Sequence, residues 1–387
     1  MIKAYIDDLK DELKQLSEYI YKNPEIGLEE YKSSKAHMDI LKKYGFAIKE
    51  NFLGFETAFK ATYKGEKPGP TIAYLAEYDA LPDIGHGCGH NLLGATSTGA
   101  GIILRKLIDE IGGTVYVLGS PAEESSGVKV DMANQGVFDN VDIAMISHPG
   151  SKHRLSGTTS ELVPLRFTFK GKSAHAASSP EKGINALDGC IMLFNSVNAL
   201  REHIKDSSRI HGVIKEGGKA ANIVPELAIA DFYIRTPVLG YMEELKEKVI
   251  NCGKASALAT GCELEISVYE KIYKGLVTNE TLSKVYGKYL EEIGVEDIFE
   301  GKVGYGSSDM GDVSQVCPAI HPSFSIVEKG KEVAGHTVEF GQATFSDLGY
   351  KGMEQAIYAL VGTAVEIIED EELLVKIKDE FKLTFNK

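Results

Sequence analysis

The sequence is poor in cysteine, in long hydrophobic runs and in basic charge. Its five cysteines, at positions 88, 190, 252, 262 and 317, are odd in number and widely spaced, so we expect no disulfide framework. No stretch reaches the roughly 18 apolar residues of a membrane span, and residues 1–16 show no secretory signal. These absences predict a cytoplasmic protein.

The charge balance disfavours two classes of partner. The chain has 42 Lys and Arg residues against 56 Asp and Glu residues, a formal net charge of −14. Nucleic acids and anionic membranes both reward basic patches, so we expect neither as the main partner. The length of 387 residues, with 43% apolar and 25% charged residues, is typical of a globular protein with two domains.

The first part of the chain alternates between helical and strand-like patterns. The spacing of apolar residues predicts helices over 3–22 and 28–44, and a buried helix over 91–110. Apolar runs predict strands over 71–76, 114–118 and 142–147. This alternation indicates an α/β domain with a mixed, largely parallel sheet flanked by helices.

A different pattern begins near Leu162. Strand-like runs over 163–175, 226–235 and 264–269 alternate with helical segments over 183–203 and 241–260. This order predicts an α+β unit of the ferredoxin-like type. The chain then returns to helix and strand and ends in a long apolar helix near 348–369. We therefore interpret 162–272 as an insertion in a domain built from 1–161 and 273–387.

One short run concentrates residue types that bind metal ions. Residues 85–91 place His86, Cys88 and His90 within five positions, with glycines between them. Soft and borderline divalent metals prefer thiolate and imidazole ligands. Because glycine permits tight backbone turns, alternate side chains can be aimed at one point. The run therefore predicts a metal site.

Further carboxylates and a histidine stand where the three predicted strands end. They are, in chain order, Asp79, Glu123, Glu124 and His148. In open α/β sheets the functional site lies outside the carboxyl ends of the strands. We therefore expect these side chains at one edge of the sheet, beside Cys88 and His90.

Each of these residues also has an ordinary structural interpretation. A cysteine between glycines is usually a small buried residue, adjacent glutamates usually form a solvated face, and a loop histidine is usually only hydrogen-bonded. Asp79 could be a turn residue before Leu81 and Pro82, although a carboxylate beside a metal site commonly orients a ligand. The coincidence of all of them favours the metal site.

Several motifs resemble a known family. They are Glu77-Tyr78-Asp79-Ala80-Leu81-Pro82, His86-Gly87-Cys88-Gly89-His90 and Pro121-Ala122-Glu123-Glu124. Together they resemble the aminoacylase and glutamate-carboxypeptidase family of dinuclear metallopeptidases, in its amidohydrolase branch. Segments 217–225 and 306–311 are most similar to aminobenzoyl-glutamate hydrolase subunits, β-alanyl-lysine-type dipeptidases and a staphylococcal aminohydrolase linked to methicillin resistance. Glu77 departs from the Asp of many relatives, and Asn91 departs from the auxin-conjugate hydrolases.

The resemblance implies two divalent metal ions that share one ligand. The implied ligands are Cys88, His90, Glu124, His148 and His336. Glu123 would be the general base that takes a proton from a water between the metals, and Asp79 would orient a ligand. A thiolate and three imidazoles favour zinc, with manganese or cobalt as alternatives.

For the insertion, the resemblance implies a lid and dimerisation domain. His211 matches a histidine that reaches the site of a neighbouring subunit, and Asn222 and Arg235 match residues that hold the substrate carboxylate. We therefore expect a homodimer or homotetramer that acts on a small molecule or peptide with a free carboxylate. A structural role is favoured for His175, and no role is assigned to His37, His153, His203 and His321.

The sequence thus predicts a metal-dependent amidohydrolase or dipeptidase that hydrolyses an N-acyl or N-aryl amino acid or a dipeptide. One alternative is a metal-dependent carboxypeptidase acting on longer peptides. Another is a non-catalytic metal-binding subunit, which is disfavoured because Glu123 and every implied ligand are present. A closed structural zinc site is also disfavoured, because Glu123 would stand free beside the ligands.

Overall fold

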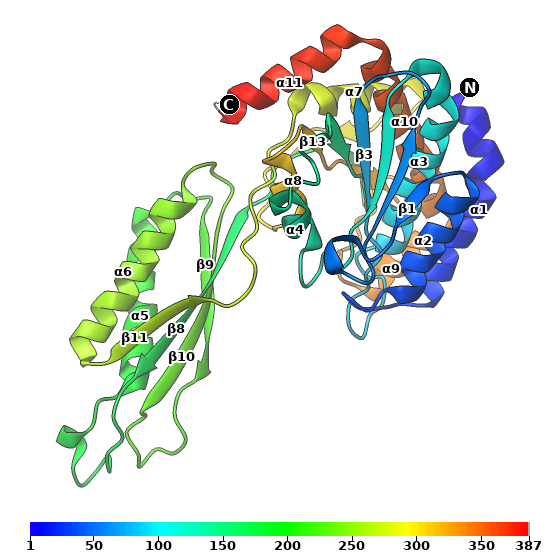
Figure 1. The fold of residues 1–387 in the computed structure, drawn as a ribbon. Helices are drawn as coiled ribbons and strands as arrows, with labels where there is room; N and C mark the ends of the chain where they lie inside the picture. Colours follow the sequence, from blue (N-terminus) through cyan, green and yellow to red (C-terminus); the bar gives the residue numbers. More distant parts are fainter. Residues whose placement is uncertain (386–387) are drawn as a thin grey trace. The chain divides into compact units, whose positions relative to one another are not determined.

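The protein is represented by a computed structural model that describes residues 1–385 and divides into two compact units (Figure 1). The smaller unit comprises 159–275 and 304–307, and the larger unit comprises the remaining described residues. The main segment of the smaller unit thus starts three residues before the predicted insertion and ends three residues after it, and 304–307 join the unit from later in the chain. No helix within 1–385 combines the length and the apolar character that a membrane crossing requires.

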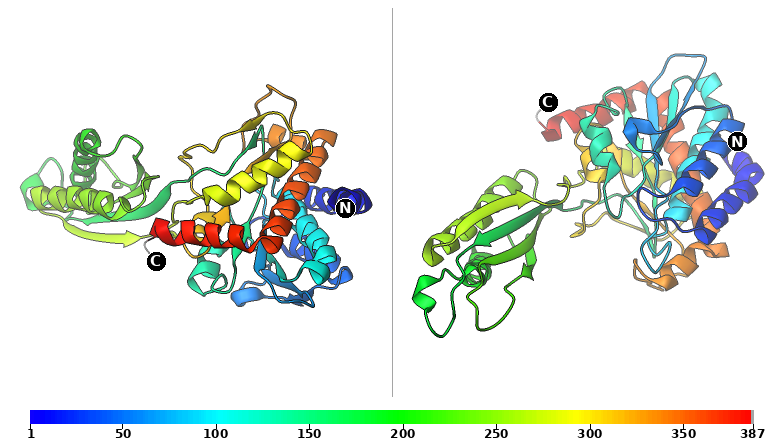
Figure 2. Two further views of the ribbon diagram at one scale, coloured as in Figure 1. Left: turned by 90° about the horizontal axis from the view of Figure 1, so that it is seen from above. Right: turned by 60° about the horizontal axis from the view of Figure 1, so that its bottom comes forward.

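The smaller unit is an antiparallel sheet with two helices packed on one face (Figure 2). Its elements are β8 (Glu161–Lys170), α5 (Ala186–Leu200), β9 (Arg209–Glu216), β10 (Leu227–Thr236), α6 (Met242–Thr260) and β11 (Glu263–Val268). The strand order β11-β8-β10-β9 and the chain order β-α-β-β-α-β confirm the ferredoxin-like α+β class. The sequence analysis did not predict β9, because this edge strand exposes most of its side chains and contains no apolar run.

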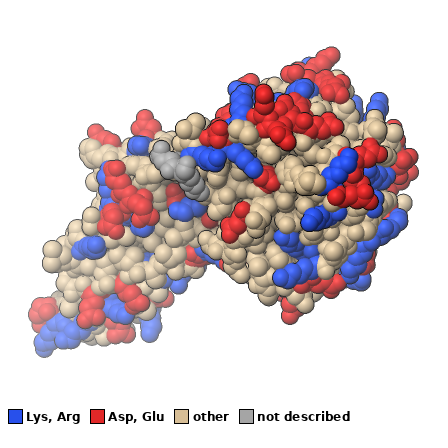
Figure 3. All heavy atoms as spheres, turned by 45° about the horizontal axis from the view of Figure 1, so that its top comes forward, with Lys and Arg blue, Asp and Glu red and all other residues tan. Residues whose placement is uncertain are grey.

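The surface in Figure 3 carries acidic and basic side chains interspersed with uncharged ones. The exposed faces of helices carry salt bridges, such as Lys10 with Asp7 and Lys35 with Asp39. Exposed pairs of this kind contribute little to stability, roughly 0–1 kcal/mol each. The stability of the fold therefore rests on its cores.

The larger unit is built on a six-stranded sheet. The strands are β1 (Ala47–Lys49), β2 (Phe59–Lys64), β3 (Thr71–Ala76), β4 (Thr114–Gly119), β5 (Ile143–Met145) and β13 (Ala319–Ile320). They are ordered β1-β2-β4-β3-β5-β13, and the four from β4 to β13 are parallel, whereas β1 and β2 are antiparallel to their neighbours. The predicted mixed, largely parallel sheet is confirmed.

The remaining elements of the larger unit are mostly helices. These are α1 (Ile2–Lys22), α2 (Tyr31–Lys43), α3 (His90–Ile111), α4 (Val128–Asn134), α7 (Glu280–Glu292), α8 (Met310–Ser314), α9 (Val338–Thr344), α10 (Asp347–Glu369) and α11 (Glu371–Phe385). Short strands β6 (His148–Gly150), β7 (His153–Arg154), β12 (Ile298–Phe299) and β14 (Ser323–Ser325) form a separate small sheet. The predicted start of α2 at residue 28 was wrong: Leu28 has a left-handed φ of 67°, so the helix begins three residues later.

Alternate residues of β3 enter two different cores. Ile72, Tyr74 and Ala76 pack with α1, α3 and α10, while Ala73 and Leu75 pack with α4 and α8 on the opposite face. This alternation follows from the two-residue period of a strand, and burial on both faces explains why the strand is apolar throughout. The sheet is therefore the middle layer of three.

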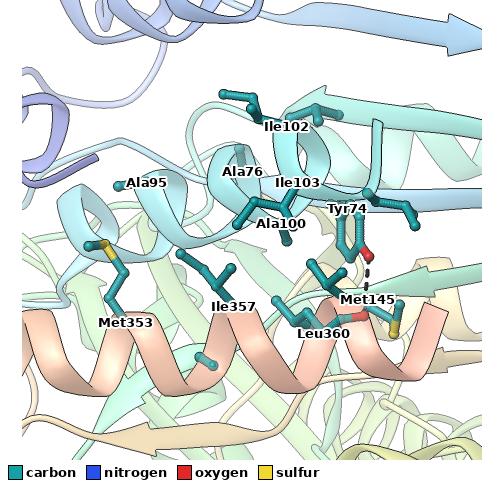
Figure 4. Close-up of a cluster of buried hydrophobic side chains, with 14 of the residues drawn as sticks. Tyr74, Ala76, Ala95, Ala100, Ile102, Ile103, Met145, Met353, Ile357 and Leu360 are labelled. Atoms are coloured by element: carbon teal, nitrogen blue, oxygen red, sulfur yellow. Dashed lines mark hydrogen bonds between the residues drawn. The ribbon is translucent and has the colours of Figure 1, made fainter. Parts of the chain in front are cut away.

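The first of these cores joins α3 and α10 directly (Figure 4). Ile103 on α3 faces Ile357 and Leu360 on α10, and the Tyr74 hydroxyl donates a hydrogen bond to the Leu360 carbonyl at 3.2 Å. The helices approach closely at Gly99, where an added Cβ would lie 2.8 Å from the Ile357 Cδ1 atom. This packing places the start of α3 beside the ends of the parallel strands.

Candidate metal centre

Three adjacent parallel strands end at one edge of the sheet and lead into most of the predicted site residues. β3 runs into Glu77 and Asp79, β4 into the turn that carries Glu123 and Glu124, and β5 into His148. The segment that contains Cys88 and His90 follows β3 and opens α3, so it reaches the same edge. The predicted grouping at the carboxyl ends of the strands is the arrangement seen in the structure.

Two sets of candidate ligands share the sulfur of Cys88. One set is Cys88, His90 and His148, and the other is Cys88, Glu124 and His336. Within each set the ligand atoms lie within 4.8 Å of one another. The structure therefore brings all five predicted ligands together, with the thiol between two groups that could each hold an ion.

Glu123 belongs to the same cluster. Its carboxylate forms a third set with His90 and Glu124, again with ligand atoms within 4.8 Å of one another. The two adjacent carboxylates therefore both reach the cluster. The predicted division of roles, with Glu124 as ligand and Glu123 as base, stays a prediction.

Hydrogen bonds orient two of the histidines, the buried His90 and the partly buried His148. The Nδ1 of His90 donates to the Asp79 Oδ1 at 2.8 Å, and the Nδ1 of His148 donates to the Pro149 carbonyl at 2.7 Å. Each bond leaves the Nε2 atom as the ligating nitrogen, the usual arrangement for a metal-binding imidazole. The Nε2 of His148 lies 3.5 Å from the Cys88 Sγ, and the Nε2 of His90 is buried without a hydrogen-bond partner.

Asp79 also positions the second set. Its Oδ2 accepts the backbone N–H of Glu124 at 3.0 Å, so one carboxylate links His90 to Glu124. The Glu124 Oε1 is buried without a hydrogen-bond partner and lies 3.3 Å from the Nε2 of His336. His336 is 60% exposed and has a left-handed φ of 61°.

The donor set fits divalent metal ions. Buried polar atoms in folded proteins are almost always hydrogen-bonded, whereas the His90 Nε2, 3.2 Å from the Glu77 Oε2, and the Glu124 Oε1, 3.3 Å from the His336 Nε2, form no hydrogen bond and can take a further partner. A cation supplies one, because both atoms offer lone pairs toward the same space as the Cys88 sulfur. Sulfur, nitrogen and carboxylate donors together suit zinc and related transition metals.

A buried lysine was missed by the sequence analysis. The Nζ of Lys129 on α4 lies 2.8 Å from the Glu77 Oε1 and 2.6 Å from the Asp309 Oδ1, with all three side chains almost fully buried. The other Glu77 oxygen is 3.2 Å from the Nε2 of His90. Lys129 stands 180 residues from Asp309 in an ordinary helical pattern, so no local signal pointed to this network.

The pKa shifts reflect an excess of buried negative charge. Burial raises the pKa of Glu123 well above its ordinary value, and the charges of Glu77 and Asp309 raise it further. Burial also raises the pKa of Asp309, to about 6 despite Lys129. For Glu77 the Lys129 and His90 charges outweigh burial and lower the pKa to about 2. Additional positive charge in this region would be stabilising.

Without additional positive charge nearby, the Cys88 side chain is a thiol and not a thiolate. Burial raises its pKa to about 12, although His90 favours the thiolate. Because the thiolate is the form that binds metal, ion binding at Cys88 would release a proton.

Two other histidines lie near the cluster. The Nε2 of His86 donates to the Ile20 carbonyl at 3.1 Å, so this residue of the glycine-rich run is held by the fold and belongs to neither set. His321, which received no role from the sequence, has its ring 5.7 Å from that of His148. Its proximity follows from the pairing of β13 with β5, which the sequence analysis did not predict.

In the smaller unit, two predicted residues share the face of the sheet opposite the helices. His211 on β9 pairs with Tyr233 on β10, and Arg235 is two residues further along β10. The Arg235 guanidinium stacks over the Tyr233 ring at 5.5 Å and donates to the Ser307 Oγ at 2.9 Å. Burial, followed by the Arg235 charge, lowers the pKa of His211 and so favours the neutral ring.

The structure does not bring Asn222 and Arg235 of one chain together. Asn222 lies in the exposed connection before β10, whereas Arg235 stands eight residues after Leu227, the first residue of that strand. Eight residues of strand span about 26 Å. His175, near Asn222, accepts the N–H groups of Ala177 and Ser178 on its Nδ1, which agrees with the structural role favoured above.

The chain is similar to known proteins, in part of its smaller unit and over nearly its whole length. Residues 159–259, most of the smaller unit, match the family model described as a peptidase dimerisation domain. The chain is 34% identical to the Xaa-Arg dipeptidase of Mus musculus over 97% of its own length and 90% of that protein. The similarity therefore spans both units.

Solved structures share the fold at lower identity. An aminohydrolase from methicillin-resistant Staphylococcus aureus matches with a TM-score of 0.80 and 18% identity, over 95% of this chain and 99% of that one. The YXEP protein of Bacillus subtilis, described as a dinuclear metal-binding peptidase from the M20 family, matches with a TM-score of 0.71 and 17% identity, over 93% and 99%.

We expect two divalent ions per chain. Because both candidate sets use the Cys88 sulfur, replacing Cys88 should affect both sites, unlike replacing a ligand of one set. Cys88→Ala should weaken both sites, whereas His148→Ala and His336→Ala should each weaken one. The loss of affinity should exceed the ~10–100-fold typical of losing an outer-shell partner. Calorimetric titration of chelator-treated protein with Zn²⁺ or Mn²⁺ measures it, with His153→Ala as control. If the Cys88→Ala variant still bound two ions with wild-type affinity, Cys88 would not be a ligand shared by the two sites.

Proposed function

The chain belongs to the M20 family of metallopeptidases, and from this premise we propose that it releases an amino acid from a dipeptide or from an N-acyl or N-aryl conjugate. It is an enzyme that acts on C–N bonds. The observation that carries the proposal is the convergence of Cys88, the other four candidate ligands and Glu123 at one edge of the sheet. A dipeptide is the first candidate substrate, because a dipeptidase is similar to the chain over nearly its whole length.

Amide hydrolysis requires an activated water, a polarised carbonyl and a proton for the leaving nitrogen. Two divalent ions in this centre would act as Lewis acids for the carbonyl and would activate water near neutral pH. Glu123 would accept the proton of the water and deliver it to the leaving nitrogen. Asp79 would position His90 and Glu124 through its two oxygens.

Arg235 is the proposed anchor for the substrate carboxylate. A guanidinium presents two parallel N–H donors that match the two oxygens of a carboxylate. Arg235 is partly buried and contacts Tyr233 and Ser307. Because these contacts already restrict its side chain, binding a substrate would cost little further conformational entropy. Asn222 would bind the same carboxylate through its side-chain amide.

The protein is proposed to act as a homodimer or homotetramer. Asn222 lies five residues before the start of β10 and Arg235 lies near the end of that strand, so a carboxylate bound by both would require two copies of the chain. β9 is a sheet edge that exposes Val213 and Ile214, and such edges favour pairing with another chain. His211, on the same strand, would then donate a hydrogen bond to the oxyanion in the partner's site. Full activity from a particle of monomer mass would contradict this assignment.

We infer the identity of the metal and the cellular location of the protein from the chemistry of its residues. The thiolate and three imidazoles favour zinc, and the carboxylates leave manganese or cobalt as alternatives. The cytoplasmic location proposed from the sequence agrees with a reduced metal-binding thiol at Cys88. Metal analysis of protein purified without added metal, and fractionation of the source cells, test the two points.

A substrate panel tests the proposed reaction. We expect the protein loaded with Zn²⁺, Mn²⁺ or Co²⁺ to hydrolyse Xaa-Arg and β-alanyl dipeptides, aminobenzoyl-glutamate or N-acetyl amino acids, and to leave a ten-residue peptide intact. Release of free amino acid is measured by chromatography, with the chelator-treated protein as control. Cleavage of the long peptide at comparable kcat/KM would favour the carboxypeptidase alternative, and no cleavage with any ion would contradict the proposal.

Replacement of Glu123 should separate metal binding from turnover. Glu123→Gln keeps the shape of the side chain but cannot accept a proton, so kcat should fall by about 10²–10⁴ while the ion content is retained. Ion content is measured by mass spectrometry and kcat by steady-state kinetics on the best substrate of the panel. Near-normal turnover in the variant would remove Glu123 as the base.

The role of Arg235 should appear in the Michaelis constant. Arg235→Ala should raise KM for a free-acid substrate with a smaller effect on kcat, because the lost contact is made in the ground state as well as in the transition state. The methyl ester of the same substrate is the control, since the ester group carries no negative charge. Equal losses on acid and ester would count against carboxylate recognition by Arg235.

A further inference from the structure

The turn that carries Glu123 and Glu124 contains an unfavourable backbone conformation. Ala122 has a φ of 59°, in the left-handed region that residues other than glycine rarely adopt. Its carbonyl accepts the N–H groups of Ser125, Ser126 and Gly127 at 3.3, 2.9 and 2.7 Å, which closes a tight turn between β4 and α4. The directions of the two glutamates depend on this conformation, because they are the next residues in the chain.

A buried carboxylate from the N-terminal part of the chain holds this turn. The Glu30 Oε1 accepts the N–H of Ala122 at 2.8 Å, and its Oε2 accepts the Thr57 hydroxyl at 2.8 Å. Glu30 is completely buried and 92 residues away from Ala122 in the sequence. This hydrogen bond satisfies a buried backbone N–H, which would be costly to leave unpaired, so Glu30 can compensate for the strain at Ala122.

The loop before Glu30 supports the same turn by packing. A Cβ added at Gly27 would lie 2.3 Å from the Ser125 Oγ and 2.9 Å from the Ala122 Cβ, so only glycine fits there without displacement. The loop also holds the other chain segment of the site, because the Ala80 N–H donates to the Glu25 carbonyl at 2.8 Å. Loop 25–30 therefore touches both segments that present carboxylates to the cluster.

We infer that Glu30 is a positioning residue of the metal centre, which keeps Ala122 left-handed and thereby directs Glu123 and Glu124 into the site. The inference rests on the proposed function, because it assigns Glu30 a role in the geometry of the proposed base and ligand. Glu30 acts through the backbone of Ala122, and its own side chain bonds Ala122 and Thr57. Nothing in the sequence between residues 23 and 31 resembles a metal-binding pattern.

Replacement of Glu30 tests this role by metal binding as well as by turnover. Glu30→Ala should weaken ion binding by about 10–100-fold, as expected for loss of a group that orients a ligand, and should lower kcat more than it changes KM. Glu30→Gln should recover most of both properties, because its amide oxygen can still accept the Ala122 N–H. Calorimetric titration of the metal-free full-length protein and steady-state kinetics measure the effects.

A second substitution separates positioning from general stability. Ala122→Gly makes the left-handed conformation accessible without strain, so the double variant Glu30→Ala/Ala122→Gly should bind ions more tightly than Glu30→Ala alone. The control is Glu12→Ala, which removes a carboxylate bonded to Tyr44 at the other end of α2 and should leave ion affinity and kcat unchanged. If Glu30→Ala does not fold, Gly27→Ala displaces the same turn with Glu30 intact and should lower ion affinity and kcat.

The outcomes distinguish this inference from the proposed function. Ion affinity and kcat at the wild-type level in folded Glu30→Ala, or in folded Gly27→Ala, would overturn the positioning role while the hydrolase assignment stands. Failure of Ala122→Gly to improve ion binding in the double variant would also overturn it. A wild-type protein that binds no ions and hydrolyses no member of the panel would instead overturn the proposed function.

Discussion

The concentration of carboxylates at the carboxyl edge of the sheet is the constraint on which the rest of the structure depends. Glu77, Asp309 and Glu123 lie close together in a poorly solvated region, with Lys129 as the compensating lysine. Buried charge without a partner is costly, and one lysine cannot balance three carboxylates. Divalent ions held by Cys88, the histidines and Glu124, as proposed above, would supply further positive charge.

The residues that orient the site come from distant parts of the chain. Asp79 connects His90 to the backbone of Glu124, and Glu30 holds the turn just before it. Lys129 joins α4 to the start of α8 through Asp309. The linking residues Asp79, Glu30 and Lys129 belong to none of the candidate ligand sets themselves. Such supporting bonds determine where the ligand atoms lie, and they require the packed larger unit to exist first.

The smaller unit contributes a different kind of surface. Its aromatic core lies between the sheet and the two helices, so the opposite face of the sheet is left for polar and charged side chains. His211, Tyr233 and Arg235 occupy that face. The strand geometry also separates the two residues, because Asn222 lies before the start of β10 and Arg235 lies near its end. A substrate site that used both Asn222 and Arg235 would therefore need two copies of the chain.

The sequence by itself determined the layer structure and the chemistry of the centre. Strand-length apolar runs predicted β3, β4 and β5, and the glycine-spaced Cys88 and His90 predicted a metal site, because burial period and ligand type are local properties. Only the tertiary structure decided which atoms meet. Lys129 and Asp309, or Glu30 and Ala122, are far apart in the chain and carry no local pattern, so their pairing follows from helix and strand packing. The edge strand β9 was not predicted, because most of its side chains are exposed and its sequence therefore contains no apolar run.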